Sequence, residues 1–302
     1  MYDYSDLIET VLLPGLEKTK LVKPYDDLKE TFNFEVANDG GDRIQKDIQV
    51  TNPTNARNFT KADVDPVSEK PTYKKAYWLH KYSESPFEVS EIDLNQARGR
   101  GDVAVENLLQ NAMSNCYENL INLLFDNMYA RIKADLLNSG TYSDAALDRT
   151  TYTVLAVHNE TTSTALTYGL TRSCRNTVTN GKPVGADLAS EYVWLIENTA
   201  FDTLEPELAL LTTWNAVNDG NAKDAGWAPI GKIQGIPTYK TEGMTDGDVL
   251  FLRKQDIHLQ EHMPRRVIYR DPGRFTVAGT IRIGVTTWVE KCWAHGMMTN
   301  KS

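Results

Sequence analysis

Residues 231–300 read GKIQGIPTYKTEGMTDGDVLFLRKQDIHLQEHMPRRVIYRDPGRFTVAGTIRIGVTTWVEKCWAHGMMTN. Short β-prone runs alternate here with turns rich in Gly, Asp and Pro, a pattern that is typical of a β-sheet. The predicted strands are Ile236–Lys240, Val249–Arg253, Arg266–Tyr269 and Thr280–Val289. The stretch holds no cluster of nucleophile, acid and base, so it predicts a scaffold and not a reaction centre.

The longest predicted element is a helix that begins at Asp102 and ends near Leu137. No proline or glycine occurs between Gly101 and Gly140, and Asp102 is a favourable N-cap residue. At 1.5 Å per residue this helix would be roughly 54 Å long. Apolar residues follow two stripes at helical spacing, which predicts packing against a sheet. The stripes are Val105, Leu109, Ala112, Cys116, Leu120 and Leu123, and then Met113, Tyr117, Ile121, Leu124, Met128, Ile132 and Leu136.

The region before this helix predicts a protruding hairpin. A turn at residues 38–42 is followed by a strand-like run, and residues 73–92 read as long, partly alternating strands. Between them, residues 52–70 are polar and poor in core residues. A long hairpin is only marginally stable alone in water, so it needs a surface to lie on. The alternative interpretation is a poorly ordered surface loop.

Five aromatic residues are concentrated in this hairpin region: Tyr73, Tyr77, Trp78, Tyr82 and Phe87. Aromatic side chains dominate the contact energy of protein interfaces. We therefore expect them to contact another subunit, because a thin hairpin has little core of its own. The alternative is that they form a local core.

The remaining chain divides into an N-terminal arm and a mixed domain. Residues 1–37 begin with a short amphipathic segment and then run extended. Between residues 141 and 230 the patterns predict strands and helices in alternation. The strands are Thr151–Val157 and Tyr192–Glu197, and the helices are Ser163–Thr179 and a weaker one within Leu204–Val217.

Composition narrows the class of protein. The 302 residues are 41% hydrophobic and 24% charged, which fits a globular protein with a substantial core. No apolar run approaches a membrane span, and the acidic N-terminus lacks the features of a signal peptide. The net charge of −9 argues against primary nucleic-acid binding, which needs clustered Lys and Arg. Three widely separated cysteines predict buried free thiols and no disulfide framework.

The sequence indicates no catalytic, cofactor or metal site. His258 and His262 match the H-x-x-E-H zinc pattern, which requires a helix to bring both rings to one ion. The local alternation and Pro264 favour a strand instead. No phosphate-binding glycine loop or nucleophile elbow is present. We therefore expect no enzyme, no cofactor and no metal.

The order of these elements resembles the HK97-type major capsid proteins of tailed phages. The resemblance rests on the GIPTY strand at 235–239, the VLFL strand at 249–252 and the final strand leading to Cys292 and Trp293. It also rests on the long helix directly after an extended loop. It implies an α+β fold with an N-terminal arm (1–37), an extended loop or E-loop (38–98), a spine helix of the peripheral domain (99–140), an axial domain (141–230) and a β-rich C-terminal part of the peripheral domain (231–302).

The resemblance implies a virion capsid assembled in the host cytoplasm. Copies would form hexamers and pentamers of an icosahedral shell that encloses DNA without sequence-specific binding and without a membrane. Scaffolding and portal proteins, and in some relatives a decoration protein, are the implied partners. Gly99, Gly101 and Gly140 flank the spine and are predicted hinges during maturation.

Two alternatives to this shell stay open, and one chemistry found in some relatives is considered beside them. An encapsulin-like compartment would use the same fold around a protein cargo. An enzyme with a site dispersed over the mixed domain is the second alternative. Some relatives also crosslink a loop lysine to a neighbouring asparagine, and this chain has Lys61, Lys70, Lys74 and Lys75 in or near its loop without a recognisable motif.

Overall fold

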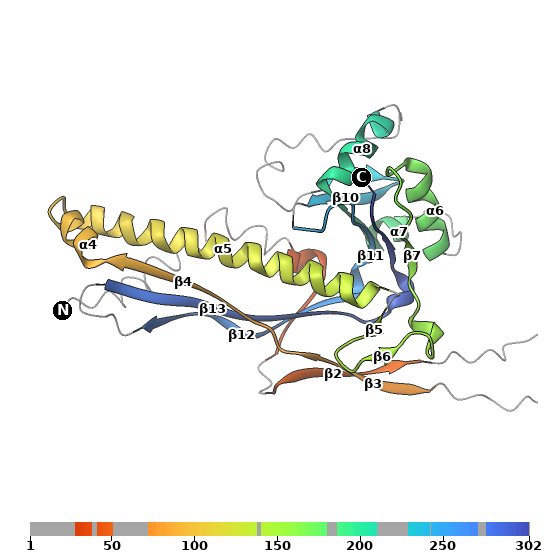
Figure 1. Cartoon of the computed structure of the whole chain (residues 1–302), viewed down its shortest axis with the longest axis horizontal. Helices are drawn as coiled ribbons and strands as arrows, with labels where there is room; N and C mark the ends of the chain where they lie inside the picture. The colour runs from red at the N-terminus through yellow and green to blue at the C-terminus, as the bar shows by residue number, and fades with distance from the viewer. Residues whose placement is uncertain are drawn as a thin grey trace, which may run out of the picture.

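The structure, a computed structural model, describes residues 28–37, 41–50, 72–137, 140–179, 186–209, 229–241, 243–270 and 276–301. The two larger β-sheets are arranged around one long helix, α5 (Asp102–Leu136). One sheet runs along the helix, and the other sits beyond its C-terminal end, with a two-stranded hairpin projecting below the junction (Figure 1). The molecule is therefore elongated along α5.

The four-stranded sheet has the order β1-β12-β13-β4. Its members are β1 (Asn33–Val36), β12 (Ile257–Arg270), β13 (Thr276–Val289) and β4 (Tyr82–Ser90). Strand β1 pairs in parallel with β12, and the other pairs are antiparallel. Strand β4 alternates strictly between exposed and buried residues, as expected when a helix covers only one face of a sheet.

Helix α5 packs its apolar stripe on β4 and β13, as predicted. Every member of the second predicted stripe is buried, from Met113 to Leu136. In the first stripe Leu123 is instead exposed. The helix begins at Asp102, so Gly101 and not Asp102 occupies the N-cap, with φ of 110° that favours glycine. A short helix, α4 (Glu91–Arg98), precedes it and is capped by the Ser90 side chain.

The six-stranded sheet has the order β7-β14-β11-β8-β10-β9. Its central strand, β8 (Tyr192–Glu197), is buried at every position. This is the pattern of a strand covered on both faces. The other strands are β7 (His158–Glu160), β9 (Pro229–Ile233), β10 (Ile236–Thr241), β11 (Val249–Arg253) and β14 (Gly296–Met298), and the associated helices are α6 (Tyr168–Val178), α7 (Ala186–Glu191) and α8 (Asn198–Ala209).

The predicted hairpin is present. Strand β2 (Arg43–Gln49) pairs antiparallel with β3 (Tyr73–Leu79), and the tip lies outside the described residues. Short elements complete the described chain: β5 (Thr141–Tyr142), β6 (Leu147–Asp148), η2 (Thr153–Leu155), η3 (Lys254–Asp256) and η4 (Cys292–Ala294).

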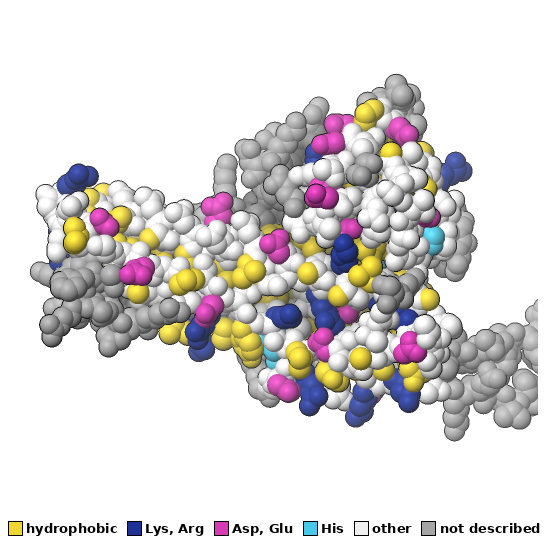
Figure 2. All heavy atoms as spheres, viewed as in Figure 1, with side chains coloured by type: hydrophobic (Ala, Val, Ile, Leu, Met, Phe, Trp, Pro, Cys, Tyr) yellow, Lys and Arg dark blue, Asp and Glu magenta, His cyan; other side chains and the backbone are white. Residues whose placement is uncertain are grey.

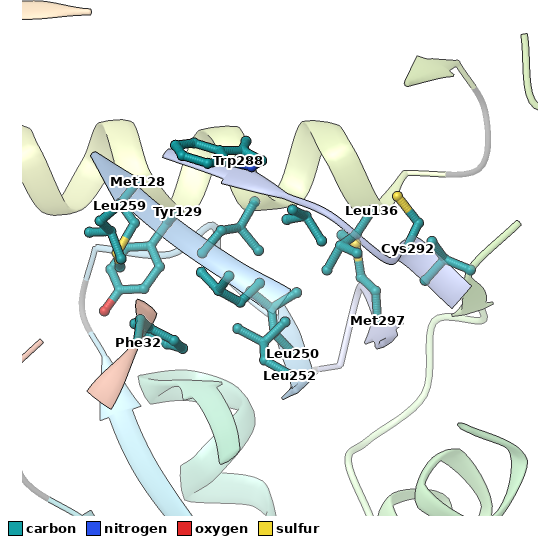
Figure 3. Close-up of a cluster of buried hydrophobic side chains, with 14 of the residues drawn as sticks. Phe32, Met128, Tyr129, Leu136, Leu250, Leu252, Leu259, Trp288, Cys292 and Met297 are labelled. Carbon is teal, nitrogen blue, oxygen red and sulfur yellow. The ribbon is translucent and has the colours of Figure 1, made fainter. Parts of the chain in front are cut away.

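Three hydrophobic clusters form the core. One lies between the N-terminal half of α5 and the four-stranded sheet, and another lies within the six-stranded sheet and its helices. The third and largest lies where both sheets, the hairpin and the C-terminal half of α5 meet. Figure 3 shows part of it, with Met128, Leu250 and Trp288 contributed by the helix and by a strand of each sheet. All three cysteines are free and buried, as predicted.

The C-terminal region differs from its prediction in one respect. Residues 231–302 do not all belong with the spine helix, because β10, β11 and β14 join the six-stranded sheet while β12 and β13 join the four-stranded one. The predicted strand Arg266–Tyr269 is part of β12, which continues past Pro264 through register shifts. Such bulges accommodate a proline that cannot donate to the ladder.

Three predictions in the mixed domain were wrong in type or bounds. The predicted strand Thr151–Val157 contains a 3-10 turn, since Asp148 accepts hydrogen bonds from Thr150 and Thr151 and holds the chain in a local turn. Helix α6 begins at Tyr168 and not at Ser163, with Thr167 as its cap. Helix α8 begins at Asn198, earlier than the predicted helix, and residues 210–217 lie outside the described residues.

Candidate assembly surface

The root of the hairpin has one face in the core and one face in solvent. Ile44, Ile48, Ala76 and Trp78 point inward and are buried in the largest cluster. The cross-strand pairs put residues 43, 45, 47 and 49 of β2 and residues 73, 75, 77 and 79 of β3 on the opposite face. We call this opposite face the hairpin outer face.

A buried polar network anchors the root to the C-terminal end of α5. Trp78 Nε1 donates to Asp135 Oδ2 at 3.1 Å, and the backbone N–H of Val289 donates to the same oxygen at 3.3 Å. Arg131 forms an ion pair with Asp135 at 3.0 Å. Burial, opposed by Arg131 and these hydrogen bonds, raises the pKa of Asp135 to about 6. The anchor therefore joins β3, α5 and β13 around one carboxylate.

A second contact ties the same root to the loop after α5. Arg131 donates to Asp144 Oδ1 at 2.8 Å, and Asp144 Oδ2 accepts from the backbone N–H of Leu79 at 2.8 Å. The backbone N–H of Asp144 donates to the carbonyl of Tyr77 at 2.9 Å. Buried or partly buried charge-assisted bonds of this kind hold geometry well. The hairpin root is thus part of the body of the molecule.

The hairpin outer face combines aromatic and basic side chains. Tyr73 is 55% exposed, Leu79 is exposed, and the Arg43 guanidinium lies over the Tyr77 ring at 5.1 Å. The charged residues on this face are Arg43, Lys75 and Asp47, whereas Lys46 and Lys74 lie on the opposite face, in a chain whose net charge is −9. Figure 2 shows Lys and Arg side chains gathered along the edge formed by this hairpin. Such a surface suits contact with an acidic protein partner.

Acidic side chains are concentrated on β4, at one edge of the four-stranded sheet, and on the short helix α4 that follows it. We call this surface the acidic edge. Strand β4 and helix α4 together carry four acidic residues and one basic residue. Glu84 and Glu88 lie on the exposed face of β4, and Glu84 accepts from Arg282 at 2.6 Å. Since β4 is the last strand of its sheet, this surface is available at an edge.

Comparison with known proteins shows which solved structures share this architecture. No protein-family model matches the chain, and no curated protein matches its sequence. Solved structures do match. The capsid of cyanophage A-1(L) aligns over 91% of this chain and 93% of its own at a TM-score of 0.65, with 12% identity.

Two further solved structures extend the likeness. A virus-like particle from Pyrococcus furiosus aligns over 98% of this chain and 100% of its own, at a TM-score of 0.52 and 13% identity. A structure of the major capsid and decoration proteins of phage G aligns over 89% of this chain and 88% of that chain, at a TM-score of 0.52 and 9% identity. The chain has the HK97-like capsid fold. Helix α5 and the β2–β3 hairpin lie in the segments predicted to be the spine helix and the E-loop, and these two assignments stay predictions.

The five aromatic residues predicted for subunit contact fall into two groups. Trp78 is fully buried and Phe87 is 5% exposed, so both belong to the core of their own chain and are withdrawn from the contact set. The alternation of β3 and β4 explains this, because both point toward α5 or the sheet junction. Tyr73, Tyr77 and Tyr82 lie on the surface, and their contact with another subunit stays a prediction.

The predicted hinge glycines occupy three different positions. Gly99 ends α4, Gly101 precedes α5 with positive φ, and Gly140 follows α5 in open space. Movement at these positions stays a prediction. Of the loop lysines, Lys74 and Lys75 are exposed on β3, whereas Lys61 and Lys70 lie outside the described residues.

The H-x-x-E-H motif lies on a strand, as predicted. His258 stacks on Trp288 and pairs with Glu290 at 3.0 Å, while His262 stacks on His80. The two rings therefore have separate partners. The described residues hold no group of three or more His, Cys, Asp or Glu side chains placed to bind a metal ion. Among the helices of the described chain, none is long and apolar enough to span a membrane.

Sequence reasoning missed the residues that anchor the hairpin. Asp135 lies on the buried stripe of α5, next to Ile132 and Leu136. An acidic residue at a core position of an amphipathic helix is the signal that could have identified it, because buried carboxylates need partners. Its partners Trp78 and Val289 come from distant parts of the chain, and local periodicity gives no information about such pairs.

Proposed function

We propose that this chain is a major capsid protein that self-assembles into hexamers and pentamers of an icosahedral shell around viral DNA. The role is mechanical and not catalytic. One observation carries the proposal: an HK97-like fold whose hairpin root is anchored in the core and presents an exposed aromatic and basic outer face. A virion location, host-cytoplasm assembly and scaffolding, portal or decoration partners belong to the same proposal.

Charge complementarity supports a specific docking between copies. The hairpin outer face of one copy carries Arg43 and Lys75 with one acidic residue, Asp47, and the acidic edge of another copy carries Glu84 and Glu88. We propose that these surfaces meet in the shell, with Tyr73 as an apolar anchor at the contact. Interfaces of permanent assemblies bury on the order of 2,000 Å² or more, so other surfaces of the chain contribute as well.

Electron microscopy and analytical ultracentrifugation of the purified chain test the proposal. We expect rings, capsomers or closed shells. Compact monomers at every concentration, temperature and salt condition tried would contradict self-assembly. The contents of any shell then distinguish a viral capsid from a compartment that holds a protein cargo, which the virus-like particle match keeps under consideration. Nuclease-protected nucleic acid in particles made during infection favours the capsid, and a single co-purifying enzyme favours the compartment.

A charge swap tests the docking itself. Lys75→Glu with Arg43→Glu should abolish assembly, and adding Glu84→Lys with Glu88→Lys should restore it. Lys232→Glu, on the exposed face of β9, is the matched single-charge control outside both surfaces. Failure of the swapped quadruple variant to assemble, while each pair alone leaves the chain folded by circular dichroism, would refute this pairing of surfaces.

A further inference from the structure

Two stacked histidines hold the connection between the hairpin and the four-stranded sheet. The connection consists of His80 and Lys81, between β3 and β4. The rings of His80 and His262 stack with centroids 4.0 Å apart and planes 20° apart. Thr286 Oγ1 accepts from the backbone N–H of Lys81 at 3.1 Å and lies 3.4 Å from His80 Nδ1. The connection is therefore attached to both β12 and β13.

Two features of the backbone create the position of His262. The residue sits in a bulge of β12, where Glu261 pairs with Val285 and Met263 pairs with Gly284, which leaves His262 without a cross-strand partner. A bulge of this kind redirects a side chain out of the regular alternation. Opposite it, a Cβ on Gly284 would lie 2.5 Å from His262 Nε2. A glycine is thus needed at position 284 for the imidazole to occupy this site.

The surroundings of the pair favour neutral rings. Nε2 of His262 is buried without a hydrogen-bond partner among the described residues, so a proton there would have no acceptor. Burial, together with the neighbouring ring of His80, lowers the pKa of His262 to about 4. Burial also lowers the pKa of His80, against an opposing attraction from Asp42.

Among the other groups around the pair, the Asp42 carboxylate attracts a proton on His80, but no acceptor among the described residues bonds to Nε2 of His262. Tyr82 contacts the His262 ring edge-on, with the two ring centroids 4.8 Å apart. Glu261, the neighbour of His262 on β12, pairs with Lys29 at 3.8 Å. Lys81 adds a further positive charge beside His80. Protonation of both rings would therefore place like charges in contact.

A cavity beside the pair gives the connection room to move. Its volume is about 190 Å³, and Leu79, Lys81 and Thr286 are among the residues that line it. A close-packed joint would resist displacement, because side chains in a dense core move only with their neighbours. Here the residues on both sides of His80 border empty space.

We propose that the His80–His262 pair is an acid-sensitive clasp that locks the β3–β4 connection to β12 when both rings are neutral and opens when they take up protons. The direction of the pH effect follows from the proton affinities of the two states. The open connection has histidines with ordinary affinity for protons, so it binds protons more tightly than the stacked state does, and acid favours it. Each linked proton changes the ratio of open to closed by at most about tenfold per pH unit. The clasp does not depend on the proposed shell.

Spin-label mobility at the connection tests the clasp. Lys81→Cys is labelled with a nitroxide in the full chain, whose three native cysteines are buried. We expect an immobilised spectrum at pH 7.5 and a growing mobile component as the pH falls from 6.5 to 4.5. In His262→Phe the ring can still stack but cannot titrate, so the spectrum should stay immobilised throughout. If that variant does not fold, His80→Phe serves the same purpose.

Two controls separate the clasp from general acid loosening. A label at Asn122, on the exposed side of α5, should not change over this range, and His158→Gln should leave the transition at Lys81 unaltered. Gly284→Ala should give the mobile spectrum already at pH 7.5, because the added methyl group displaces the imidazole. A pH-independent spectrum at Lys81, a transition that persists in His262→Phe, or a parallel transition at Asn122 would overturn the proposal.

Discussion

The two larger sheets of this molecule differ in how their faces are covered. The six-stranded sheet has a central strand that is buried at every position, because its own helices cover one face and the junction with α5 and the four-stranded sheet covers the other. The four-stranded sheet and hairpin are covered by α5 on one side, and along β4 every second residue is exposed. The first region satisfies its apolar surface within one chain. The second presents ordered, anchored strands with one face exposed among the described residues, as the proposed assembly would require.

The largest expected effect on the free energy of unfolding comes from a substitution in the hairpin. Comparing its buried and exposed faces tests the contrast between covered and uncovered surface directly. Trp78→Ala removes a fully buried indole and one of the hydrogen-bond donors to Asp135, so the free energy of unfolding should fall by roughly 5 kcal/mol. Tyr73→Ala, on the exposed face of the same strand, should change it by less than about 0.5 kcal/mol while weakening assembly. Urea unfolding of both variants measures the difference, and similar losses for the two would show that the two faces are not distinct.

Acid should weaken the six-stranded region through His295. This ring is fully buried and accepts from the backbone N–H of Arg253 at 3.1 Å, and burial lowers its pKa to about 3. The unfolded chain binds the proton near pH 6.5, so stability is complete above that pH and is lost as the pH falls toward 3, by up to about 5 kcal/mol. Thermal unfolding between pH 7 and 4 measures the loss. A His295→Gln variant with an unchanged pH profile would contradict it.

Asp135 should respond to acid in the opposite direction. Its folded pKa of about 6 lies above the ordinary value of 3.8, so the folded state binds the proton more tightly. The anchored root should therefore gain up to about 3 kcal/mol as the pH falls from 6 toward 4. Asp135→Asn keeps an acceptor for Trp78 and should remove this part of the pH dependence. We expect the stability of Asp135→Asn and that of His295→Gln to deviate from the stability of the parent chain in opposite directions as the pH falls.

A smaller effect is expected at Gly247, before β11 in the six-stranded sheet. Its φ is +76°, and an added Cβ would lie 2.7 Å from the backbone nitrogen of Lys301. Gly247→Ala should lower stability by about 1–3 kcal/mol, because the backbone conformation and the close approach both exclude a side chain. Gly140→Ala, which meets open space, is the matched control. Equal melting temperatures for the two variants would show that the C-terminal contact does not stabilise this region.

The fold was predictable from sequence where local pattern decides structure. The absence of Gly and Pro and the apolar stripe predicted α5 almost to its ends, and the runs of β8 and β11 matched the observed strands. The pattern failed where side chains bond locally or reach distant partners. Lys301, for example, bonds to the Thr162 carbonyl and Thr164 Oγ1, in the stretch before α6 where a helix was predicted to begin.

The candidate site was predictable only in part. The hairpin and its aromatic content were visible in the sequence, but which rings point inward depends on the register of β3 against the sheet junction. The assignment of β10, β11 and β14 to one sheet and of β12 and β13 to the other is likewise a tertiary property. Strand propensity is the same in both cases and does not distinguish them.

The path of the C-terminal residues between the two sheets has a mechanical consequence. The chain leaves the six-stranded sheet at Arg253, runs through β12 and β13, and returns to it at Gly296. Both crossings are short and begin and end in strands with paired neighbours. Tension applied to either sheet is therefore carried to the other by these two crossings, in addition to the path from β4 through α5 to β7. A wall built from such subunits would stretch at the contacts between copies before the two halves of any one copy came apart.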